Sequence, residues 1–173
     1  MSMAKVVFVI GGTRSGKSAF ALSQATELEG RKVYIATAQA FDAEMIGRIE
    51  KHKKERGNDW ETMEEPIHLG DAVRKGMASH DVVIIDCLTI WLSNLFCARG
   101  DIRATSDEFL DALRSLRGSS RLFIVSNEVG MGIVPENALA REFRDVAGKM
   151  NQNVAQIADE VFLVAAGIPV RIK

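Results

Sequence analysis

Eight residues near the start of the sequence carry the pattern of a phosphate-binding loop. GGTRSGKS, residues 11–18, matches G-x-x-x-x-G-K-[ST]. The glycines let the backbone curl so that successive N–H groups point at phosphate oxygens, and Lys17 adds a positive charge. Ser18 would offer its hydroxyl to Mg²⁺. The sequence therefore predicts a nucleotide-binding loop, made of Gly11, Gly12, Thr13, Arg14, Ser15, Gly16, Lys17 and Ser18.

The context of the loop supports this prediction. The apolar run KVVFVI precedes it at residues 5–10, and a helical pattern follows at residues 17–29. A glycine-rich turn that only enters a helix is the alternative, but such a turn requires neither a lysine nor a serine at these two places.

Asp86 follows a second apolar run, VVII at residues 82–85. In many proteins with this loop, an acid at the end of a neighbouring strand holds Mg²⁺ through water. An aspartate in this position also serves as the N-cap of a following helix, here residues 88–99, and the pattern leaves both interpretations open. The sequence contains no N-K-x-D tetrapeptide, which excludes an ordinary regulatory GTPase.

His52 lies in a charged stretch, RIEKHKKERGNDW at residues 48–60. The helical pattern over residues 42–56, with Asp42 as N-cap, places His52 on the same side as Ile49 and Arg56. A neutral imidazole there is a nucleophile able to attack phosphorus. A histidine at the edge of an apolar stripe is the more common case, and the stretch alone does not decide between the two.

Composition indicates one globular domain spanning residues 1–173. The sequence is 47% hydrophobic and 26% charged, with a formal charge of −1. That charge gives no general attraction to nucleic acid, although a basic face around residues 51–56 would suit a phosphate backbone. We find neither a signal peptide nor a membrane-spanning run, and expect a cytoplasmic protein. Cys87 and Cys97 are expected as buried free thiols.

Continuous apolar runs, typical of strands buried on both faces of a parallel sheet, alternate with helical patterns. We expect strands at residues 5–10, 32–37, 81–86, 121–126 and 160–165. Helices are expected at 17–29, 42–56, 68–78, 88–99, 105–117 and 136–158, the last beginning at Pro135. The end, AAGIPVRIK, suggests a hairpin or edge strand. The predicted fold is an α/β three-layer domain of the P-loop NTPase (RecA-like) type with a mostly parallel sheet.

Taken together, several segments resemble one family. The family is the bifunctional adenosylcobinamide kinase and adenosylcobinamide-phosphate guanylyltransferase of cobalamin biosynthesis. The similar segments are GGTRSGKS, the strand ending YIATAQ, DAEMIGRIEKHKKERGNDW, the acid after VVII and above all SNEVGMGIVPEN. The resemblance extends over essentially the whole sequence. It implies that ATP or GTP phosphorylates the corrinoid adenosylcobinamide, after which GMP passes from GTP to the new phosphate through a GMP-histidine intermediate, releasing pyrophosphate.

The resemblance also implies site residues. His52 fills the family pattern R-I-x-x-H-K and would carry GMP. Besides residues 11–18, nucleotide contacts are implied for Thr37, Ala38, Gln39, Lys53, Lys54, Glu55, Arg56, Glu64 and Asp86. Asp86 stands where some relatives have Glu, so either base contact or metal support is implied. A homotrimer with Mg²⁺ as cofactor is expected.

The motifs also allow other interpretations. A single-activity P-loop small-molecule kinase would make His52 dispensable, and a RecA-like ATPase or nucleic-acid-binding module would use the basic face instead. Glu128, Arg141 and Arg144, in and after SNEVGMGIVPEN, either face the substrate or hold the loop and the long helix together. We favour the second role for these three.

Overall fold

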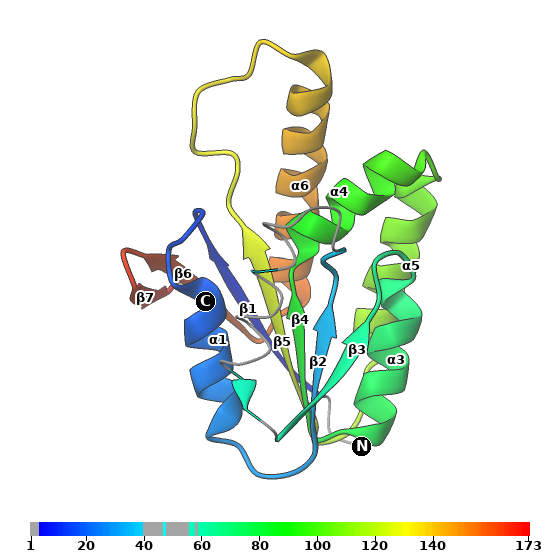
Figure 1. Cartoon of the computed structure of the whole chain (residues 1–173), viewed down its shortest axis with the longest axis vertical. Coiled ribbons are helices and arrows are strands. Elements are labelled where there is room, and N and C mark those ends of the chain that lie inside the picture. Colours follow the sequence, from blue (N-terminus) through cyan, green and yellow to red (C-terminus); the bar gives the residue numbers. More distant parts are fainter. Residues whose placement is uncertain (1–3, 40–46, 48–55, 58) are drawn as a thin grey trace.

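A seven-stranded sheet forms the centre of the computed structural model, which describes residues 4–39, 47, 56, 57 and 59–173. The strand order is β3-β2-β4-β5-β1-β6-β7, and all pairs are parallel except β6 with β7 (Figure 1). The strands are β1 (Lys5–Gly11), β2 (Lys32–Ala36), β3 (Trp60–Glu64), β4 (Val82–Asp86), β5 (Arg121–Asn127), β6 (Glu160–Ala165) and β7 (Ile168–Arg171). The predicted α/β fold with a mostly parallel sheet is confirmed.

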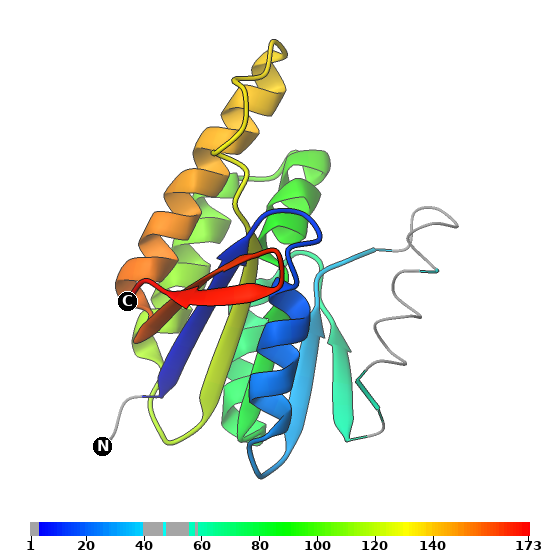
Figure 2. The ribbon, with the colours of Figure 1, turned by 90° about the vertical axis from the view of Figure 1, so that its left-hand side faces the viewer.

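Helices cover both faces of the sheet and make three layers (Figures 1 and 2). The helices are α1 (Lys17–Thr26), α3 (Leu69–Ser79), α4 (Leu88–Ala98), α5 (Ile102–Ser115) and α6 (Ala138–Ile157). Helix α1 packs on one face, against a core that includes Val9, Ile84 and Val125. Helices α3 to α6 bury the other face, around Phe8, Trp91 and Ile124. Below, the first of these is called the α1 face.

Strand β3 was not predicted from the sequence. Its segment, WETME, pairs only with β2 and lies at the edge of the sheet. Trp60 is buried, whereas Glu61 and Thr62 are exposed, so the segment lacks the continuous apolar run by which the central strands were recognised.

Two helices begin at different residues from those expected. Helix α6 starts at Ala138, and the side chain of Asn137, not Pro135, caps it by accepting the N–H of Ala140 at 3.0 Å. Helix α5 starts at Ile102, because Asp101 accepts the N–H of Ala104 at 2.9 Å.

The predicted C-terminal hairpin is confirmed. β6 and β7 pair antiparallel, with Ala166 (φ 51°) and Gly167 (φ 80°) in the turn between them. Figure 2 shows this red hairpin beside the blue loop that precedes α1. Among the described residues, no helix has the length and apolar character needed to cross a membrane.

Candidate nucleotide site

The phosphate loop connects β1 to α1 at the carboxyl end of the parallel sheet. Gly16 precedes α1 with φ 94°, a left-handed conformation that favours glycine. Lys17 is only 8% exposed, and its Nζ donates to the carbonyl oxygen of Gly12 at 3.1 Å. The lysine charge is thereby folded back over the loop, where it would meet phosphate groups held by the N-terminus of α1.

The loop is also packed closely against its neighbours. A Cβ atom at Gly11 would collide with the carbonyl oxygen of Val164 and would lie 2.6 Å from Ser15 Oγ. A Cβ at Gly16 would lie 3.2 Å from the Cα of Gly167. Close approach therefore requires glycine at both places, and at Gly16 the left-handed backbone conformation requires it as well.

Thr37 joins the end of β2 to the residue that follows β4. It is fully buried; its hydroxyl donates to the Cys87 carbonyl at 2.9 Å and accepts the Cys87 N–H at 2.8 Å. The side-chain amide of Asn94 donates to the Thr37 carbonyl at 2.8 Å. The Thr37 side chain thus connects the ends of β2 and β4. Ala38 and Gln39 follow it at the carboxyl end of the sheet, and both are partly exposed.

Asp86 ends β4 on the α1 face and does not cap α4. The residue at the N-cap position of α4 is Cys87, whose side chain makes no capping hydrogen bond. Asp86 Oδ2 instead accepts the hydroxyl of Tyr34 at 2.6 Å. Burial and the neighbouring Asp86 charge raise the pKa of Tyr34 well above its usual range, so this hydroxyl remains a donor. Of the two interpretations of Asp86, the N-cap is wrong.

Glu64 lies at the same carboxyl end of the sheet, as the last residue of β3. Ala36 at the end of β2 pairs with Glu64 of β3 on one side and with Asp86 of β4 on the other. The two predicted acids therefore flank one strand end.

Arg56 is the described residue closest in sequence to His52. It is helical, and Gly57 with φ 71° follows it. Its guanidinium carbon lies 3.8 Å from the centre of the Tyr34 ring, and the side chain is 8% exposed. His52, Lys53, Lys54 and Glu55 lie outside the described residues, as does the predicted N-cap Asp42.

Tyr34 and Asn127 are two further polar residues near the site that no sequence motif predicted. Asn127 ends β5 beside Gly11, its partner in β1. Its Oδ1 and Ser15 Oγ are buried, and neither has a hydrogen-bond partner among the described residues. Asn127 directly follows a buried apolar strand, as Asp86 does. A polar residue in this position lies at the carboxyl end of a parallel sheet, where ligands bind, so the sequence could have predicted Asn127 as a site residue.

The segment after β5 is held by its own polar groups. Glu128 Oε1 accepts the N–H of Gly130 at 2.6 Å. Arg141 Nη1 donates to the carbonyl oxygens of Pro135 and Glu136 at 2.9 and 2.6 Å. For Arg141, on α6, these contacts agree with the favoured role of holding the loop to the long helix, whereas the Glu128 contact stabilises the segment itself. Arg144 Nη1 is buried and has no partner in the described part of the chain.

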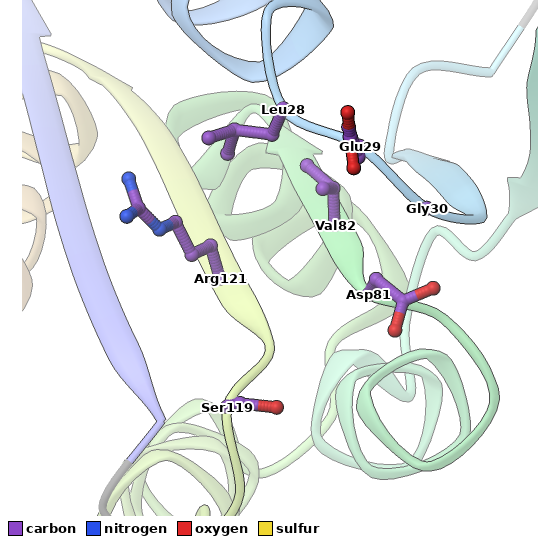
Figure 3. A pocket seen from close by; sticks show the side chains of 7 residues that line it. All are labelled: Leu28, Glu29, Gly30, Asp81, Val82, Ser119 and Arg121. Atoms are coloured by element: carbon purple, nitrogen blue, oxygen red, sulfur yellow. The ribbon is translucent and has the colours of Figure 1, made fainter.

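A cavity of about 390 Å³ lies at the opposite, amino end of the sheet (Figure 3). Figure 3 shows Asp81 and Arg121 near the starts of β4 and β5, with Glu29 on the loop after α1. No residue of the phosphate loop lines this cavity, so it is separate from the nucleotide site. A second cavity, about 730 Å³, lies between α1 and Arg56 and is lined by Ala19, Leu22, Ser23, Thr26, Glu27 and Arg56.

Solved structures with a similar fold include the flagellar accessory protein FlaH from Methanocaldococcus jannaschii, with 12% identity and a TM-score of 0.53 over 100% of this chain and 80% of that one. The ATPase EscN of the enteropathogenic E. coli type III secretion system gives 10% identity and a TM-score of 0.57, over 94% of this chain and 43% of that one. At such identities the likeness supports the fold alone.

Sequence comparison is more specific. The chain is 41% identical to the "bifunctional adenosylcobalamin biosynthesis protein CobU" of Salmonella typhimurium, over 97% of this chain and 99% of that protein. It is 39% identical to the "bifunctional adenosylcobalamin biosynthesis protein CobP" of Pseudomonas aeruginosa, over 95% of each. A family model described as cobinamide kinase / cobinamide phosphate guanyltransferase matches residues 7–172. The chain therefore belongs to the cobinamide kinase/cobinamide phosphate guanyltransferase family.

Proposed function

We propose that this chain is a bifunctional enzyme that first phosphorylates adenosylcobinamide and then guanylylates the product. The observation that carries the proposal is the family match over residues 7–172, together with a phosphate loop folded as that activity requires. The two reactions share one nucleotide site but act at different phosphorus atoms of the nucleoside triphosphate.

In the first reaction, a hydroxyl of adenosylcobinamide attacks the γ-phosphorus of ATP or GTP and the nucleoside diphosphate leaves. The N–H groups of residues 11–18 and the Lys17 ammonium hold the phosphates and offset the charge that develops on them. Ser18 is partly exposed at the start of α1, and Asp86 presents a carboxylate on the same face of the sheet. These oxygen donors suit Mg²⁺, which takes few protein ligands alongside phosphates. The ion would neutralise phosphate charge.

In the second reaction, a ring nitrogen of His52 attacks the α-phosphorus of GTP and pyrophosphate leaves with the electrons of the broken P–O bond. A phosphate oxygen of adenosylcobinamide phosphate then attacks the same phosphorus and releases the imidazole, giving adenosylcobinamide-GDP. Arg56, four residues after His52, contacts the ring of Tyr34 in β2, so the chain directly after the histidine segment packs on the same face of the sheet as the phosphate loop's helix α1.

We also propose that the protein works as a homotrimer in the cytoplasm, where ATP and GTP are available. Several large apolar side chains support association of copies, because they are exposed in the single chain. Met131, Ile133 and Val134 lie in the segment after β5 and Leu139 lies in the first turn of α6. Ile168 and Val170 lie on β7, and Ile172 directly follows it.

The proposal is tested by supplying the substrates one at a time with Mg²⁺. Adenosylcobinamide with ATP should give adenosylcobinamide phosphate, and adding GTP should convert it to adenosylcobinamide-GDP with one pyrophosphate for each product. Phosphorylation without any guanylylation would identify a single-activity kinase. Hydrolysis of ATP with neither product would contradict both steps.

A further inference from the structure

Tyr34, the only tyrosine in the sequence, lies within β2 with its ring on the α1 face. Its register partner in β4 is Ile84, and Asp86 lies two residues further along β4 on the same face. The tyrosine side chain is long enough to pass Ile84, so its hydroxyl reaches Asp86 Oδ2 at 2.6 Å. The hydrogen bond thus runs along the sheet toward its carboxyl end, where the phosphate loop also lies.

The ring of Tyr34 contacts two other side chains, Trp60 and Arg56. The Trp60 ring, from β3, is nearly perpendicular to it, with the ring centres 6.4 Å apart and an angle of 87° between the planes. The Arg56 guanidinium lies over it at 3.8 Å. Tyr34 and Arg56 are 6% and 8% exposed, so this cation–π contact is largely removed from water, where such contacts are strongest.

Packing alone does not explain a tyrosine here. Phenylalanine would fill the same space between Trp60 and Arg56 without placing a hydroxyl in a buried position, which costs free energy unless a partner accepts it. That partner, Asp86, is itself a charged group at the edge of the site. The hydroxyl holds one carboxylate oxygen and so restricts rotation of the carboxylate.

We infer that Tyr34 is a positioning residue of the nucleotide site, whose hydroxyl orients Asp86 and whose ring seats Arg56. The inference rests on the proposed function in one respect, which is that Asp86 and Arg56 contact the nucleotide. Tyr34, within β2, thereby holds two site residues that come from different segments of the chain, Asp86 and Arg56.

A double-mutant cycle tests the hydroxyl. Equilibrium dissociation constants for GTP with Mg²⁺ are measured for the parent, Tyr34→Phe, Asp86→Ala and the double variant. Tyr34→Phe should weaken binding by about three- to tenfold in the parent and have no further effect in the Asp86→Ala background, where no side-chain oxygen remains to accept the hydroxyl. Equal effects in both backgrounds, or no effect in either, would overturn the role of the hydroxyl.

The ring is tested by comparing Tyr34→Phe with Tyr34→Leu, which differ in the surface offered to Arg56. Tyr34→Leu should bind GTP more weakly than Tyr34→Phe, and Arg56→Met should abolish the difference between them. A difference that persists with Arg56→Met would show that the ring acts only in packing.

Ser126→Ala is the matched control, because the Ser126 hydroxyl is also buried and donates to a side chain, Asn151 Oδ1 at 2.8 Å, on the opposite face of the sheet. It should lower stability without changing GTP affinity. A parent protein that binds no GTP would contradict the proposed function. If the parent binds GTP but the effects of the Tyr34 and Asp86 substitutions on binding free energy are additive, only the role of Tyr34 is contradicted.

Discussion

The backbone N–H of Gly167, in the turn between β6 and β7, donates to the carbonyl oxygen of Ser15 in the phosphate loop at 2.8 Å. The hairpin at the end of the described chain thereby supports a loop that lies more than 150 residues earlier in the sequence. The Cα of Gly167 also fills the space beside Gly16. The shape of the nucleotide loop therefore depends on the last two strands as well as on its own glycines.

Gly167→Ala should destabilise the protein by about 1 kcal/mol and weaken nucleotide binding, because Gly167 has φ 80° and alanine disfavours this conformation. Gly118→Ala is the control: Gly118 has φ 114°, and a Cβ there would meet nothing within 4 Å, in the loop between α5 and β5. Urea unfolding and GTP titration separate the two effects. Equal losses of GTP affinity in both variants would argue against support of the phosphate loop by the hairpin.

Lys17→Met should reduce affinity for ATP and GTP by about tenfold or more while leaving the fold intact, because a hydrogen-bonded charge on phosphate contributes about 1.5–3 kcal/mol. The Lys17 ammonium lies over the loop and contacts Gly12. Lys5→Met, at the other end of β1 where Lys5 pairs with Glu160 at 2.8 Å, is the matched control and should retain nucleotide affinity. Unchanged nucleotide binding in Lys17→Met would show that the loop does not hold phosphate.

The phosphate loop, its flanking elements and the parallel sheet were predictable because local patterns encode them: continuous apolar runs, a fixed glycine spacing and a lysine–serine pair. Strand β3 was missed because an edge strand carries no such run. The Tyr34–Asp86 hydrogen bond depends on the register of β2 against β4, which becomes defined only when the strands pair. The contact of Gly167 with Ser15 likewise needs β6 to lie beside β1.

The two cysteines should differ in reactivity, which corrects the expectation that both are buried. Cys87 is buried, and burial raises its pKa to about 12, so the thiol stays protonated and shielded at pH 8. Cys97, on α4, is exposed. A thiol reagent should therefore modify one cysteine per native chain rapidly and the second only after unfolding. Rapid modification of Cys87 in the native protein would contradict the buried position after β4.

Acid should weaken the fold in part through Glu160. A hydrogen bond from Lys5 lowers the pKa of Glu160 below 4.5, so the pair stabilises the folded state above that value and is lost as pH falls through the folded-state pKa. Lys5→Met should therefore lose less stability than the parent between neutral pH and about pH 3. Urea unfolding at the two pH values measures this. An identical loss in both proteins would show that the pair makes no contribution.

The most direct measurement is covalent labelling with α-³²P GTP and Mg²⁺, followed by peptide mapping of the parent and of His52→Ala. Retention of the label on the protein requires a bond to the α-phosphorus, which phosphorylation by the γ-phosphate does not make. We predict acid-labile label confined to the peptide that contains His52, release of pyrophosphate, transfer of the label to adenosylcobinamide phosphate and no label in His52→Ala. Label that persists in His52→Ala, or a parent protein that binds GTP and phosphorylates adenosylcobinamide yet never becomes labelled, would contradict guanylyl transfer through His52.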